Sequence, residues 1–249
     1  MTPQKLLLLS NGLKDYGGMK FDGATNYLDG NALTGIADSK VGTFVAIVRF
    51  ANASGTAEKL FGPDGAAFSV LREADGNIQI LARNAATTVI MNYNATAAPC
   101  TAAGTYVILA SWDLATPGSA RLYVNEVQGV NSTTYTDDTI DYTRTEWGIG
   151  ASVTGATPLN GDLYLLWFDP TQRLEFNTDS VRRKFTEASG IPRYLGQSGE
   201  RPTGTAPGVF HAYDPAVSWA TNRGTFNATT WTKNGTFADP TVMLRGRAH

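Results

Sequence analysis

The feature that most constrains the fold of this chain is a series of short apolar segments, alternating with a period of two and separated by turn residues. Segment 43–50 is apolar at both alternating sets of positions, which indicates a strand covered on both faces. Segments 68–72 and 77–82 flank Asp75-Gly76, the signature of a tight hairpin. Further strands are predicted at 87–93, 105–112, 120–125, 146–150 and 162–168. Short strands at this spacing predict an all-β sandwich or jelly roll.

One segment has the pattern of a short helix. Residues 177–179 offer N-cap side chains, and Val181 and Phe185 are four positions apart. Residues 189–190 (Ser-Gly), with a proline shortly after, are expected to end the helix. The basic residues 182–184 are expected on its solvated side.

Composition excludes several classes of protein. Lys and Arg number 20 against 22 Asp and Glu, a net charge of −2, and no basic run occurs, which argues against a nucleic-acid partner. One Cys and two His exclude a disulfide framework and a Cys/His zinc site. No apolar run approaches the roughly 20 residues of a membrane span, and the first residues do not match a signal peptide. We therefore expect no membrane partner and folding in a reducing cytosol.

The two ends differ from the centre. Residues 1–18 form a predicted N-terminal arm, and residues 193–249 form a predicted extension that begins with a Gly/Pro/Thr-rich strap. Both carry large apolar side chains that need a cover, either the sandwich itself or a partner. The candidate partner-docking residues are Leu6, Leu7, Leu8, Leu9, Trp219 and Trp231.

Several short motifs follow one another in a familiar order. They are Phe21-Asp22-Gly23 with Tyr27-Leu28, Gly42 to Arg49, Trp112-Asp113 with Arg121 to Asn125, and Gly148 to Gly150 with Leu159 to Leu163. In this order they resemble the LamG-like, concanavalin A-like lectin/glucanase family, over residues 19–192. The resemblance implies a concanavalin A-like jelly-roll sandwich with one short helix and a C-terminal extension.

The extension carries a resemblance of its own. Residues 202–207 (Pro-Thr-Gly-Thr-Ala-Pro) and 222–226 (Asn-Arg-Gly-Thr-Phe) are similar to tails that follow LamG-like domains in bacteriophage and prophage proteins. The second pair of glycines in that pattern is absent here. This resemblance implies a virion protein.

The chain departs from the catalytic and metal-binding members of the family. Retaining glucanases place two carboxyl groups about 5 Å apart on one strand as Glu-x-Asp-x-Glu. No such motif occurs, and Asp137, Asp138 and Asp141 have the wrong spacing, so we expect no enzyme activity. The calcium-binding Asp-Glu pair of pentraxin-type relatives is Tyr164-Leu165 here. No cofactor or metal is predicted; calcium at the 137–141 loop stays open, with an acidic surface turn the favoured interpretation.

One candidate glycan site can be assembled from the sequence. Tyr142 and Trp147 lie near the polar loop 131–145 and are the aromatic pair most expected to be exposed, where a ring could stack on a sugar. Asn131, Asp137 and Asp138 would bind its hydroxyl groups. The alternative, that the two aromatics cap the end of the sandwich, is favoured.

Together these observations predict a non-enzymatic bacteriophage virion structural protein: a capsid decoration, head fibre, collar or tail component. It is expected to assemble in the host cytoplasm and reside in the virion, contacting other virion proteins and forming a homo-oligomer. The alternative is a lectin-like carbohydrate-binding module for a host surface glycan. A degenerate glycosidase is a third, weaker interpretation.

Overall fold

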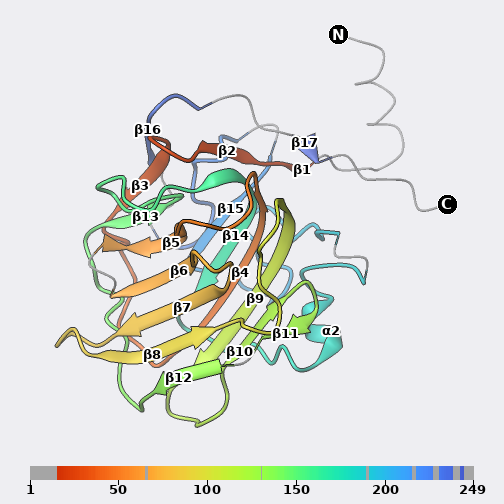
Figure 1. Cartoon of the computed structure of the whole chain (residues 1–249). Helices are drawn as coiled ribbons and strands as arrows, with labels where there is room; N and C mark the ends of the chain where they lie inside the picture. The colour runs from red at the N-terminus through yellow and green to blue at the C-terminus, as the bar shows by residue number, and fades with distance from the viewer. Residues whose placement is uncertain are drawn as a thin grey trace.

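Two large antiparallel sheets packed face to face make up the molecule. The computed structural model describes residues 16–64, 67–129, 131–188, 191–214, 217–226, 230–237 and 242–243. Figure 1 shows β5 to β8 in one layer and β4, β9 and β14 in the other. The predicted all-β jelly-roll sandwich is confirmed. Among the helices of the described residues, none has the length and apolar composition needed to cross a membrane.

The first sheet has seven strands in the order β11-β10-β9-β4-β14-β15. β2 pairs with the first half of β14, and β15 pairs with its second half along the same edge. The strands are β2 (Met19–Asp22), β4 (Val41–Phe50), β9 (Gly104–Asp113), β10 (Arg121–Val124), β11 (Val127–Gln128), β14 (Asn160–Asp169) and β15 (Val209–Ala212).

The second sheet has eight strands in the order β12-β8-β7-β6-β5-β13-β3-β16. The predicted Asp75-Gly76 hairpin joins β6 to β7, with Gly76 at a φ of 90° that suits the turn. The strands are β3 (Tyr27–Asn31), β5 (Glu58–Pro63), β6 (Phe68–Arg72), β7 (Ile78–Arg83), β8 (Val89–Asn94), β12 (Asn131–Tyr135), β13 (Trp147–Ile149) and β16 (Thr232–Asn234).

The central strands of the seven-stranded sheet are buried on both faces. Along β4, Phe44 and Val48 face the core between the sheets, while Val45 and Ile47 face a second apolar cluster on the opposite side. The segment that follows β14 supplies much of that second cover. This two-sided cover explains why β4 is apolar at both alternating sets of positions.

Aromatic side chains fill the space between the sheets. The Phe61 ring lies 5.0 Å from Trp147 and 5.1 Å from Phe168, centroid to centroid. Phe68 lies 5.4 Å from Phe168 in a stacked arrangement. These rings come from β5, β6, β13 and β14, so one cluster ties both layers together.

The cover after β14 contains the predicted helix in a shorter form. Helix α2 spans Asp179–Arg182, and Phe185 follows it into the second apolar cluster. Arg182 and Arg183 do not lie on a solvated face, contrary to the prediction. Both guanidinium groups bind the carboxylate of Glu126, at 2.8 and 2.9 Å, because the turn after β10 meets the helix there.

The described parts of residues 193–249 pack on the sandwich of the same chain. β15 and β16 add strands to both sheets, and Trp219 and Trp231 are buried in the core between them. The prediction that these two tryptophans dock on a partner is therefore wrong. It assumed that they are exposed, whereas the chain itself covers them. Leu6, Leu7, Leu8 and Leu9 lie outside the described residues.

The two ends of the described chain meet. β1 (Tyr16–Gly17) pairs with β17 (Val242–Met243) in a separate two-stranded sheet. Both strands lie at one side of the sandwich in Figure 1.

His211 on β15 anchors the C-terminal segment. Its ring lies 5.2 Å from that of Trp219 and 5.0 Å from that of Trp231, and its Nδ1 donates to the Trp219 carbonyl at 2.9 Å. Complete burial lowers the pKa of His211 from 6.5 to about 4. The folded protein therefore holds this ring neutral at every pH above about 4.

Folding stability should consequently fall as the pH drops from 6.5 to 4, because only the unfolded chain takes up the proton in that range. The full loss is about 3 kcal/mol, and it levels off below pH 4. Urea unfolding of the wild type and of His211→Phe at several pH values isolates this contribution from those of the carboxyl groups. NMR offers a direct check because the chain has only two histidines. A His211 signal that titrates near pH 6.5 contradicts the prediction.

Candidate functional site

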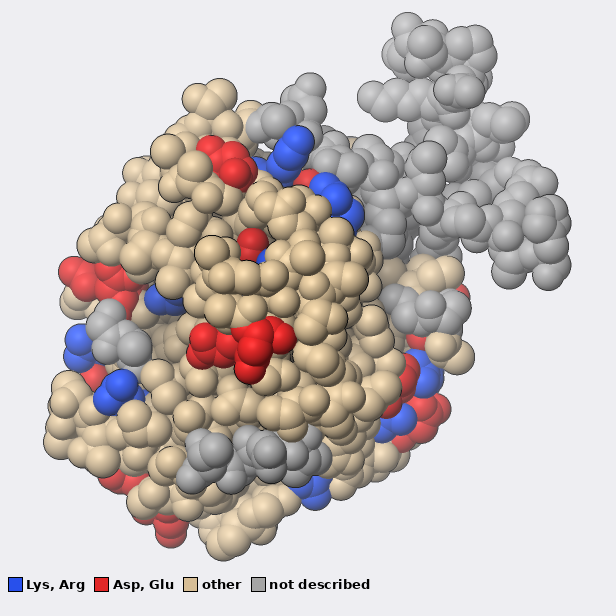
Figure 2. Space-filling view, in the orientation of Figure 1, with Lys and Arg blue, Asp and Glu red and all other residues tan. Residues whose placement is uncertain are grey.

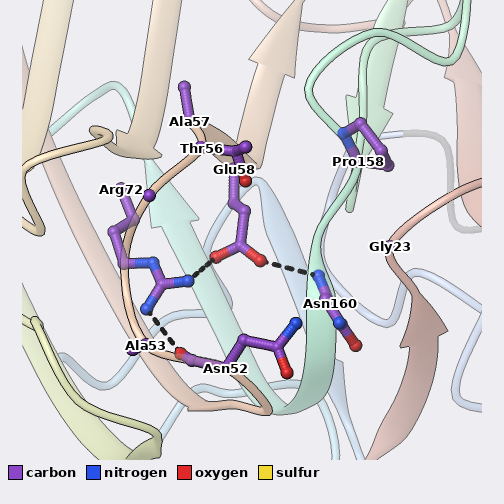
Figure 3. Close-up of a pocket in the computed structure, with 10 residues that line it drawn as sticks. Gly23, Asn52, Ala53, Thr56, Ala57, Glu58, Arg72, Pro158 and Asn160 are labelled. Atoms are coloured by element: carbon purple, nitrogen blue, oxygen red, sulfur yellow. Dashed lines mark hydrogen bonds and ion pairs between the residues drawn. The ribbon is translucent and has the colours of Figure 1, made fainter.

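A pocket of about 400 Å³ opens at one end of the sandwich. Three connections form its rim: the loop between β4 and β5, the turn after β2, and the residues that lead into β14 (Figure 3). The lining residues are Gly23, Asn52, Ala53, Gly55, Thr56, Ala57, Glu58, Arg72, Pro158 and Asn160.

A buried ion pair forms the floor of this pocket. Glu58 on β5 and Arg72 on β6 stand opposite each other in the strand register, and their side chains are in direct contact. Arg72 is 1% exposed, and its guanidinium lies 4.0 Å from the centroid of the Phe50 ring. Burial raises the pKa of the Glu58 carboxyl, while the Arg72 charge opposes that rise.

The same two side chains hold the surrounding backbone in place. Arg72 Nη1 donates to the carbonyl oxygens of Asn52, at 3.1 Å, and Cys100, at 3.2 Å. The Asn160 amide N–H donates to Glu58 Oε1 at 3.1 Å. The pair therefore joins the loop before β5 to the start of β14 (Figure 3), and it also holds the loop before β9 through Cys100. Burial raises the pKa of the Cys100 thiol to about 12, so this thiol is not a nucleophile at neutral pH.

The rim above the ion pair is polar and uncharged. Asn52 and Asn160 contribute side-chain amides and Thr56 a hydroxyl group, and Figure 3 shows the Asn52 side chain pointing toward Asn160. Amides and hydroxyls both donate and accept hydrogen bonds, as a neutral polar ligand requires. On the face drawn in Figure 2, charged side chains of the described residues form small separate groups on a mostly uncharged surface.

Acid–base chemistry has only one lining carboxyl group available. Glycoside hydrolysis of the usual kind uses two, one on each side of the scissile bond. Glu58 is the only acidic residue among those that line the pocket, and its carboxylate is already ion-paired with Arg72. The other polar side chains of the lining are the amides of Asn52 and Asn160 and the Thr56 hydroxyl group.

The structure does not expose the predicted aromatic pair. Tyr142 and Trp147 are both fully buried, and the Tyr142 hydroxyl accepts a hydrogen bond from Trp112 Nε1 at 3.0 Å. Trp147 belongs to the aromatic cluster around Phe61, because β13 pairs between β3 and β5. The prediction that these rings stack on a sugar at the surface is therefore wrong; they are part of the core.

The polar residues of that predicted site are also dispersed. Asn131 begins β12, opposite Asn94 in the register, whereas Asp137 and Asp138 follow the other end of the strand. Asp137 binds Lys40 at 2.8 Å, and Asp138 accepts from the Asn84 amide at 2.7 Å.

The loop left open for calcium has no converging ligands. Asp141 pairs with Arg144 at 3.1 Å, while Asp137 and Asp138 face Lys40 and Asn84. Across the described parts of the chain, no three His, Cys, Asp or Glu side chains gather as a metal site.

The pocket over Glu58 and Arg72 was not predicted from the sequence, although one signal for it exists. Phe68, Val70 and Arg72 share the inward face of β6, so the alternation that buries the first two also buries the arginine. A charge at an inward position needs a buried partner, and an acidic residue on a neighbouring strand is the natural candidate.

Comparison with known proteins supports the fold. No protein-family model matches the sequence, and no curated protein matches it. A putative carbohydrate binding protein from Bacteroides ovatus superposes with a TM-score of 0.60 and 14% identity, covering 93% of this chain. This chain spans only 60% of the length of that protein.

Two other solved structures have lower scores. The CBM40 domain of the Ruminococcus gnavus IT-sialidase has a TM-score of 0.46 and 12% identity, covering 68% of this chain and 97% of its own. Domains LG4-5 of the mouse laminin alpha1 chain have a TM-score of 0.43 and 11% identity, covering 64% of this chain and 44% of theirs. The likeness to the Bacteroides protein, at 14% identity, establishes the sandwich fold and nothing about the ligand.

Replacing Arg72 with Met should destabilise the fold by about 3–5 kcal/mol, because it leaves the Glu58 carboxylate buried without its partner. The double variant Glu58→Gln/Arg72→Met removes both charges and should recover part of that loss. Urea unfolding measures both, with Arg83→Met on β7 as the matched control. A loss below about 1 kcal/mol for Arg72→Met contradicts the assigned role of the pair.

Proposed function

We propose that this chain is a non-catalytic carbohydrate-binding protein that holds a neutral sugar unit in the pocket above Glu58 and Arg72. The observation that carries the proposal is the pairing of an uncharged amide rim with a rigid, ion-paired floor. Asn52 and Asn160 offer donors and acceptors to a ligand rich in hydroxyl groups.

The size and rigidity of the pocket support this assignment. Its volume of about 400 Å³ lies within the range of small-molecule sites. Because Arg72 fixes the Asn52 backbone and Glu58 fixes the Asn160 backbone, little ordering of the rim remains to oppose binding. The Bacteroides ovatus protein that shares the fold is named as a putative carbohydrate binding protein, which agrees with this function.

The proposal adopts the alternative derived from the sequence in place of the virion role. The bacteriophage structural role, the location in the virion and the assembly into homo-oligomers rest on the resemblance at 202–207 and 222–226 and on the apolar residues predicted at the two ends of the chain. Trp219 and Trp231, two of the residues predicted to contact a partner, pack within the chain, and the other four, Leu6 to Leu9, lie outside the described residues. Association with purified particles is the measurement that tests the virion prediction.

The glycan proposal predicts binding to at least one neutral oligosaccharide on a broad glycan array. Asn52→Ala and Asn160→Ala should each weaken that binding about 5- to 10-fold in calorimetric titrations, since each removes hydrogen bonds to hydroxyl groups. Asn177→Ala is the matched control, because Asn177 lies just before α2 and its side chain binds Tyr123 instead. Unchanged affinity in both pocket variants, or an array without any bound glycan, contradicts the proposal.

A further inference from the structure

A second pocket, of about 270 Å³, lies on the face of the eight-stranded sheet opposite the core. Glu58 and Lys59 are neighbours on β5 and point to opposite sides, so Glu58 lines the first pocket and Lys59 the second. The lining residues of the second pocket are Lys59, Asp64, Ser69, Leu71, Ser152, Thr154, Ala156 and Thr157.

Lys59 is a buried cation with few partners. It is 5% exposed, and its ammonium donates one hydrogen bond, to the Pro63 carbonyl at 2.7 Å. It forms no ion pair among the described residues. Burial lowers the pKa of Lys59 to about 8, and Asp64 opposes that change. The side chain therefore remains mostly charged at pH 7. A buried ammonium has three N–H groups that need oxygen acceptors, and the Pro63 carbonyl accepts from one of them.

Ser69 presents a second unsatisfied group to the same pocket. Its Oγ is buried and has no hydrogen-bond partner among the described residues. The pairing of Phe61 with Val70 places Ser69 beside Gly62, next to the path of the Lys59 side chain toward Pro63. At Gly62 the backbone of β5 comes close to that of β6. A Cβ there would lie 2.3 Å from the Phe68 carbonyl oxygen, so only glycine fits. Lys59 and Ser69 thus both line this pocket, and the Ser69 hydroxyl group has no hydrogen-bond partner among the described residues.

The loop before β14 forms a firm wall around that space. The Ser152 and Thr154 hydroxyl groups lie 2.7 Å apart, and the Ala156 amide donates to Ser152 Oγ at 2.9 Å. The Lys59 amide donates to the Thr157 carbonyl at 2.8 Å, which attaches the wall to β5. Thr157 has a φ of 52°, an uncommon backbone conformation for a β-branched residue.

We propose that this second pocket binds a single carboxylate group, with one oxygen accepting from Lys59 Nζ and the other from Ser69 Oγ. Two donors match the two oxygens of a carboxylate, and the Lys59 ammonium is the one positive charge in the lining. Asp64, the only other charged residue in the lining, disfavours a dianion such as a phosphate monoester.

The molecule that carries this carboxylate is an acidic sugar; this step rests on the proposed function. The two pockets share one wall, since Pro158 lines the first and Ala156 and Thr157 line the second. A glycan seated over Asn160 can therefore extend across this wall. The ligand that fits both pockets is a glycan in which a uronic-acid-type unit lies beside a neutral sugar unit.

The test uses D-glucuronate, its neutral methyl ester and D-glucose 6-sulfate, each titrated at pH 7 into the full-length protein and followed by NMR. Glucuronate should bind at least about tenfold more tightly than its ester and more tightly than the sulfate, and should shift the Lys59 side-chain signals. The preference over the ester should decline from pH 7 to pH 10 as the ammonium loses its proton. Equal affinity for acid and ester, or a stronger sulfate signal, overturns the carboxylate assignment.

Two variants locate the effect. Lys59→Met keeps the apolar stem and should abolish the preference, and Ser69→Ala should reduce it severalfold. Lys40→Met, at the exposed Lys40–Asp137 pair, should leave it unchanged. A preference for glucuronate over its ester that survives Lys59→Met overturns the proposal. Neutral oligosaccharides titrated into Lys59→Met report on the first pocket alone: if they bind while wild type shows no preference for the acid, this inference fails and the proposed function stands.

Discussion

The structure depends on the burial of its central strands on both faces. β4, β9 and β14 present apolar side chains to the opposite sheet and also to the outer side, so one sheet-on-sheet core cannot cover them. The chain after β14 supplies the second cover, with Phe176 and Phe185, before it returns as β15. The C-terminal residues are also part of the sandwich, because β15 and β16 extend its two sheets and Trp219 and Trp231 are buried in the core between them.

Strand β5 supplies a charged side chain to each of the two pockets. Its first two residues carry opposite charges and face opposite sides of the sheet, and each is deeply buried. A buried charge that lacks compensation destabilises a fold, so each needs a local solution. Glu58 has Arg72, whereas Lys59 has a backbone carbonyl and a hydroxyl-rich wall. The two charges are therefore compensated differently: Glu58 by a direct ion pair, and Lys59 by a backbone carbonyl with Asp64 in the same pocket lining.

The sequence was sufficient to predict the sandwich because its signals are local: the alternation in β4 and the Asp-Gly turn between β6 and β7. β5 was missed because Glu58, Lys59 and Gly62 interrupt its apolar pattern. The predicted site failed for a different reason. Tyr142 and Trp147 have polar neighbours in the sequence, but pairing of β13 with β3 and β5 places Trp147 in the core, and Tyr142 packs beside Phe68. Burial of this kind is decided by long-range pairing, which no local pattern reports.

The ion pair at the floor of the first pocket also has a consequence for the folding equilibrium. Glu58 binds the backbone of a residue 102 positions away, so its site has high contact order and cannot form from any local part of the chain. An unfolded or partly paired chain has no rim for a ligand to contact. A ligand of this pocket therefore acts on the folding equilibrium as a whole, and its saturation raises the stability of every strand that must be in place before the pocket exists.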